Sequence, residues 1–185
     1  MDKNQEAPAK KKGYVKLRHF SRQVALQNLY QIDLKNKNTI NAESVTKEFL
    51  MQNSCLEDDS ISPQELEGKI EDFELWSYAS ELVKGCLVHW EEINQKISSL
   101  AKNWALERMT VIDRSILRIA VYELCYGRDI PSSVAINEAI ELGKKYSTVQ
   151  SGSFINGILD NLVKKEAITA KKNSLEKKPE VKKPD

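Results

Sequence analysis

The chain has 185 residues, of which 41% are hydrophobic and 30% charged, which suits one compact domain with a well-solvated surface. Only seven Gly and five Pro occur, and the abundance of helix-forming residues favours helices over strands. The three cysteines are odd in number and form no CxxC pair, and no signal peptide or long apolar run is visible, so we expect a cytoplasmic protein without disulfides or membrane spans.

The net charge of +1 hides an acidic body with basic ends. Residues 1–22 carry +5, residues 164–185 carry +4, and the residues between them carry −8. Basic ends suit a polyanion, although solubilising tails explain the same pattern. We expect residues 1–16 to be a disordered basic arm and residues 169–185 a disordered lysine-rich tail, flanking a single helical domain over residues 17–168.

Apolar residues recur at helical spacing over 17–34, and this pattern predicts the first long helix. A shorter helix is predicted near residues 42–51, followed by an acidic loop over 53–67. Amphipathic patterns over 71–89 and 90–103 predict two further helices, with a break near His89.

A capping box, Thr110 with Asp113, predicts the start of the next helix: the Thr hydroxyl accepts from the Asp113 amide, and the carboxylate reaches back to the Thr110 amide. Residues 112–124 are apolar on most faces, which is typical of a central, buried helix. Gly127 and Pro131 are predicted to end it, and another helix follows from about residue 134.

A turn is predicted over residues 147–152, with Ser151 as the N-cap of a last helix that carries Phe154, Ile155, Ile158, Leu159, Leu162 and Val163. Gly157 inside it costs roughly 1 kcal/mol against Ala, so we expect close contact with a neighbouring helix to compensate. Together the patterns predict an all-α fold of about seven helices in two packed small bundles.

No sequence motif of catalysis or metal binding is present. The chain has only two His, neither at a metal-ligand spacing, and it lacks GxSxG, P-loop and GxGxxG motifs. These observations favour a binding protein over an enzyme.

Residues 108–163 are the informative region. They contain IDRSILRIAVYEL over 112–124, VAINEAIEL over 134–142 and SFINGILD over 153–160. With RHFSR and ALQNLY in the first helix, these blocks resemble the signature segments of the NusB family over roughly residues 18–165.

The resemblance implies an all-helical RNA-binding factor that needs neither catalysis nor a cofactor. Members of the family bind boxA-type single-stranded RNA together with NusE, a small-subunit ribosomal protein. The assembly joins a transcribing RNA polymerase and supports antitermination, notably on ribosomal RNA operons. A homodimer that hides the RNA-binding face is a further possibility.

The resemblance also implies site residues. The RNA-binding candidates come from the arm and first helix and from the three motif segments, which we expect to converge on one face: Lys10, Lys11, Lys12, Lys16, Arg18, His19, Arg22, Arg114, Lys145, Tyr146, Ser151, Phe154 and Asn156. Cations suit phosphates, and an aromatic ring can stack on a base, although Phe154 is equally explained as core. The candidates for NusE are Tyr30, Glu107 and Asp113, since acidic residues suit a basic partner. Glu123 and Glu138 also match the family motifs and are predicted to form hydrogen bonds between helices.

Two alternatives to an RNA-and-NusE adaptor remain. Some RNA cytosine methyltransferases carry this kind of helical domain at their amino terminus, but they need a catalytic domain after it. A protein-only scaffold is the other alternative, because only two Arg stand in the 18–22 segment.

Overall fold

The structure is a computed structural model, and it describes residues 6–35, 40–52, 54, 73–101, 104–127 and 130–176. The side chains of residues 6–15 and 167–176 are outside this description, as is the loop predicted over 53–67 apart from Ser54. Within the described ranges the chain forms seven α-helices, two short 3-10 helices and no strand. The elements in chain order are α1 (Glu6–Leu34), η2 (Ala42–Ser44), α2 (Lys47–Gln52), α4 (Phe73–Val88), α5 (Trp90–Leu100), η3 (Leu106–Arg108), α6 (Val111–Cys125), α7 (Ser132–Tyr146) and α8 (Ser151–Glu176). The predicted all-α class and the break at His89 are confirmed.

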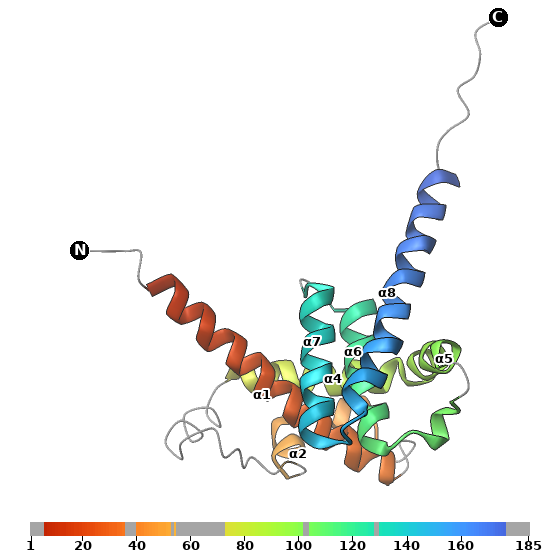
Figure 1. Cartoon of the computed structure of the whole chain (residues 1–185). Coiled ribbons are helices and arrows are strands. Elements are labelled where there is room, and N and C mark those ends of the chain that lie inside the picture. Colours follow the sequence, from red (N-terminus) through yellow and green to blue (C-terminus); the bar gives the residue numbers. More distant parts are fainter. Residues whose placement is uncertain are drawn as a thin grey trace, which may run out of the picture.

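Helix α6 lies at the centre of the molecule and packs against α1, α4, α5, α7 and α8 (Figure 1). Its burial follows from its sequence, which is apolar on most faces and leaves little to present to water. One continuous core results, to which each of the seven helices contributes a buried aliphatic side chain: Leu29, Leu50, Leu82, Ile93, Leu117, Leu142 and Leu159.

The helix signals around α6 are confirmed in part. Thr110 Oγ1 accepts the Asp113 amide at 3.0 Å, as the capping box predicts. The other half of the capping box, a bond from the Thr110 amide to the Asp113 carboxylate, is not made by Oδ1. This oxygen is buried and has no hydrogen-bond partner. At the other end, the Gly127 amide donates to the carbonyls of Tyr122 and Glu123, and Pro131 precedes α7.

Two expectations for α8 are wrong. Ser151 is the first residue of the helix rather than its N-cap: its Oγ accepts the Thr148 amide at 3.2 Å and bonds Ser147, so it closes the preceding turn. Gly157 makes no close helix contact, because it is exposed and a Cβ built there meets nothing within 4 Å.

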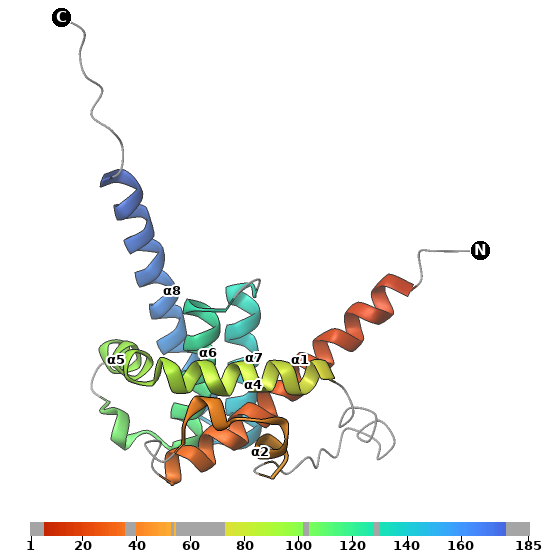
Figure 2. The ribbon, with the colours of Figure 1, turned by 180° about the vertical axis from the view of Figure 1, so that it is seen from behind.

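Both terminal helices are longer than their apolar patterns predict. Helix α1 begins at Glu6 and α8 continues to Glu176, so helix replaces part of the expected basic arm and tail. Extending a helix from a packed segment costs far less than nucleating one, and Pro8 falls in the first turn, where proline is tolerated. Figures 1 and 2 show these two ends leaving the body in diverging directions. No helix among the described residues is long and apolar enough to cross a bilayer.

Candidate nucleic-acid and partner interface

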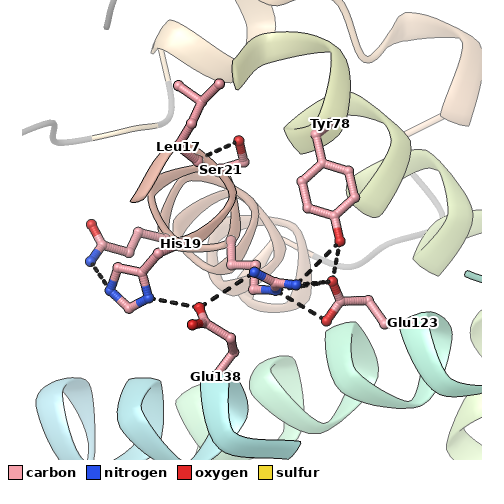
Figure 3. Close-up of polar contacts among 8 residues, drawn as sticks. Leu17, His19, Ser21, Tyr78, Glu123 and Glu138 are labelled. Carbon is pink, nitrogen blue, oxygen red and sulfur yellow. Dashed lines mark hydrogen bonds and ion pairs between the residues drawn. The ribbon is translucent and has the colours of Figure 1, made fainter. Parts of the chain in front are cut away.

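The strongest polar cluster is internal and joins α1, α4, α6 and α7 (Figure 3). Arg22, only 3% exposed, donates from Nε to Glu123 at 2.9 Å, and its Nη1 lies 3.4 Å from Glu138. The Tyr78 hydroxyl donates to the same Glu123 carboxylate. Glu123 and Glu138 therefore form the predicted bonds between helices.

The neighbouring charges favour the charged forms of Arg22 and Glu138 in this cluster. Burial opposes charge on Arg22, but Glu123 more than offsets it and raises the pKa of the guanidinium. Burial likewise opposes charge on Glu138, yet the hydrogen bond from His19 and the charge of Arg22 lower its pKa. Burial and the neighbouring Glu123 raise the pKa of Tyr78, so this phenol stays protonated and donates.

Two further candidates of α1, His19 and Arg18, contact residues of this cluster. His19 Nδ1 lies 2.7 Å from Glu138, and the His19 side chain is 34% exposed. The Arg18 guanidinium stacks 3.6 Å from the centroid of the Tyr78 ring, and Lys16 is exposed. Lys10, Lys11 and Lys12 belong to α1, but their side chains lie outside the described part of the chain.

Arg114 occupies a different region, at the start of α6. Its Nε donates to Asp33 at 2.5 Å, and its Nη1 donates to the Met109 carbonyl. Arg118 shares the same Asp33 oxygen at 2.8 Å, and the two guanidinium groups lower the pKa of Asp33 despite its partial burial. These residues line a polar hollow of about 370 Å³ together with Glu107.

A second, mainly apolar hollow of about 510 Å³ is also lined by residues of the 106–114 segment. Its lining comes from η3, the start of α6, the turn after α7 and the start of α8: Trp104, Arg108, Met109, Thr110, Asp113, Thr148, Gln150, Ser151 and Phe154. We call it the aromatic hollow, because Trp104, 52% exposed, meets the Phe154 ring edge-on at 6.0 Å.

The unpartnered Asp113 oxygen lies in the wall of the aromatic hollow. Asp113 is 6% exposed, and a buried acceptor without a donor costs free energy. Asp113 therefore brings to the lining of this hollow a carboxylate of which one buried oxygen has no hydrogen-bond partner.

The other candidates lie on α7, α8 and α1. Lys145 and Tyr146 end α7, with the Lys145 ammonium 5.2 Å from the Tyr146 ring. Asn156 donates to Asp160 at 3.3 Å within α8. Tyr30, a partner candidate, is half-buried on α1, one turn before Asp33.

The structure separates the candidates at Arg18, His19 and Arg22 on α1 from the candidates that line the two hollows. Arg18 and Asp33, which holds Arg114, are fifteen residues apart on α1, or about 22 Å along the helix axis. The candidates for RNA and for protein are also interleaved: Asp113 shares one hollow with Phe154, and Glu107 shares the other with Arg114.

Sequence reasoning missed Trp104 and Asp33. Trp104 carries a usable signal, an aromatic residue in a polar segment just before the first motif. Asp33 carries none, because only the packing of α1 on α6 brings it to two arginines.

Comparisons with known proteins agree on one family. The NusB family model matches residues 19–164. The chain is 41% identical to the transcription antitermination protein NusB of Desulforamulus reducens over 146 residues, covering 79% of this chain and 89% of that protein.

Solved structures give the same result. The fold is similar to T. maritima NusB with a TM-score of 0.62 and 31% identity, covering 80% of this chain and 90% of that one. A structure of the antitermination factors NusB and NusE in complex with dsRNA is similar with a TM-score of 0.62 and 25% identity, covering 81% and 98%.

Proposed function

Since the chain belongs to the NusB family, we propose that it is a transcription antitermination factor that binds boxA-type single-stranded RNA together with NusE. In this role it joins the RNA polymerase antitermination complex and supports transcription of ribosomal RNA operons. The aromatic hollow carries the proposal, because Trp104 and Phe154 offer stacking surface in a hollow that Asp113 also lines.

The roles divide around this hollow. Trp104 and Phe154 provide faces on which a base stacks, and Lys145 supplies a nearby cation for phosphate. Asp113 and Glu107 provide negative charge for a basic protein partner, one in each hollow. RNA and protein therefore meet across residues 106–114 and bind cooperatively.

Arg22 has a positioning role in this proposal. It is buried between two carboxylates and presents little to solvent, so it holds α1 against α6 and α7 while Arg18 and Lys16 remain at the edge. Lys10, Lys11 and Lys12 of α1 extend the same positive charge along the helix.

The test is a fluorescence-anisotropy titration with boxA RNA, a scrambled RNA of equal length and a duplex, each with and without NusE at several salt concentrations. We expect preference for boxA, tighter binding with NusE and a steep loss of affinity with salt. Equal affinity for boxA and scrambled RNA, unaffected by NusE, contradicts the proposal.

Two variants separate the roles. Trp104→Ala should weaken RNA binding about 5–150-fold, the equivalent of one lost stacking contact, whereas Phe73→Ala, an exposed aromatic residue on α4, should not. Asp113→Asn should reduce the gain from NusE more than binding of RNA alone, and Glu43→Gln on η2 is its exposed control.

A protein-only scaffold is the second candidate, because internal contacts take up Arg22 and stack Arg18 on Tyr78. It predicts that NusE binds without any RNA and that Lys145→Gln and Trp104→Ala leave the complex unchanged.

A further inference from the structure

The outward face of α8 has a feature that the fold does not explain. Gly157 lies in the interior of this helix, where glycine is unfavourable, yet it is exposed and nothing in the described structure approaches it. A glycine without an intramolecular partner leaves helix backbone open to a ligand that comes close.

This open face begins at the aromatic hollow and leads away from it. One stripe of α8 carries Phe154, then Asn161 seven residues later and Lys165 four residues after that. Asn161, Lys164 and Lys165 are exposed, and the opposite face is buried through Ile155, Leu159 and Leu162.

The stripe continues beyond the body. Glu166 ties α8 to α5 through Lys96 at 3.2 Å, and the helix then runs on to Glu176, clear of the other helices in both views (Figures 1 and 2). The sequence places lysine pairs at 164–165 and 171–172, two turns apart and on the face opposite Glu166. The family match ends at residue 164, so the second pair lies outside the matched residues.

We propose that RNA held at the aromatic hollow continues along the outward face of α8, passing over Gly157 and onto the lysine pairs at 164–165 and 171–172. This inference rests on the proposed function and extends it to RNA that flanks the boxA-type segment. Lysines act as point charges on phosphates, so the extension reads no sequence. Asp160 lies at the edge of the stripe, where the four lysines outnumber its single negative charge.

An RNA backbone fits this face better than an acidic protein. The stripe is continuous with a hollow that offers base-stacking surface, and a phosphate backbone can lie against bare helix at Gly157. An acidic protein would use the lysines without needing the glycine.

The experiment measures anisotropy of a short boxA RNA and of the same RNA extended by ten nucleotides at either end, using the full chain. The extended RNA should bind the unaltered chain more tightly. The double variant Lys171→Gln, Lys172→Gln should remove this gain in affinity. It should also reduce the slope of log affinity against log salt concentration by about 1.4, because two phosphate contacts are lost. The ratio of the affinities at 50 and 200 mM salt then changes about sevenfold. Binding of the short RNA should stay the same.

Lys47→Gln with Lys84→Gln is the matched control, since it removes two charges from α2 and α4, the helices facing the reader in Figure 2. Gly157→Ala adds an independent readout: it should raise the unfolding midpoint by about 2–4 °C and yet weaken binding of the extended RNA.

Equal affinity for the short and extended RNA overturns the inference, as does a loss of the same size in the control pair. Loss of binding to an acidic protein with RNA binding intact also overturns it. Failure of the short boxA RNA to outcompete scrambled RNA contradicts the proposed function instead, so the two failures are distinguishable.

Discussion

Replacing Arg22 by Met tests whether the buried cluster, rather than a surface contact, explains this arginine. The change keeps a long side chain but removes the charge between Glu123 and Glu138. Arg22 is 3% exposed and Glu123 is 2% exposed, so the Glu123 carboxylate would remain in the core without its partner. Removing one member of such a buried pair costs about 3–5 kcal/mol.

The assay is urea unfolding followed by circular dichroism. At roughly 2–4 °C per kcal/mol for a chain of this size, the thermal midpoint should also fall by about 10 °C. Adding Glu123→Gln should restore part of the loss, because the uncompensated carboxylate is then neutral and still accepts from Tyr78. Lys144→Met is the control: its pair with Glu141 is exposed, and the loss should be below about 0.5 kcal/mol.

RNA affinity provides the second readout. Under conditions where the Arg22→Met variant is folded, its affinity should stay within about twofold of the unaltered chain. Unchanged stability together with a large loss of RNA affinity would refute the reasoning, because Arg22 would then act at the surface.

Three further predictions follow from single contacts. Thr110→Ala removes the acceptor of the Asp113 amide at the start of α6 and should cost about 1 kcal/mol in urea unfolding, whereas Thr110→Ser should cost much less; equal losses would contradict the capping role. Asp33 and Glu138 have lowered pKa values, so the stability that they contribute is complete above their unfolded pKa values near 4 and is lost as the pH falls through the folded ones. The urea midpoint should therefore drop steeply below about pH 4, and less steeply in the Glu138→Gln variant. If the midpoint falls with pH in the same way in both proteins, the ion pairs of Glu138 with Arg22 and His19 do not contribute. Cys86 is fully buried and burial raises the pKa of its thiol, so a thiol reagent should modify it only on the timescale of unfolding. Fast labelling at Cys86 itself, located by peptide mapping of the folded chain, would contradict that placement.

Patterns within one helix could be predicted from the sequence, because they depend on neighbours a few residues apart. The apolar positions around Leu117 indicated a central helix, and Thr110 marked its start. Gly127 and Pro131 marked the segment between α6 and α7. The family motifs also place Phe154 and Asp113 among the candidates.

Contacts between helices depended on the tertiary structure. Arg18 and Arg22 are one turn apart and equally basic in sequence, yet the packing of α1 against α6 buries one and leaves the other beside Tyr78. Asp33 meets Arg114 from 81 residues away, a separation over which no helical periodicity carries information.

The surface of α8 shows the same division. The apolar pattern predicts that residues after 152 are helical and that Gly157 weakens that helix. Only the assembled fold decided that Gly157 faces open space, because the rotation of α8 is set by which of its side chains the core accepts: Ile155, Leu159 and Leu162 are buried, and the glycine is left outside. Local composition specifies elements, and long-range packing specifies which residues are left to bind.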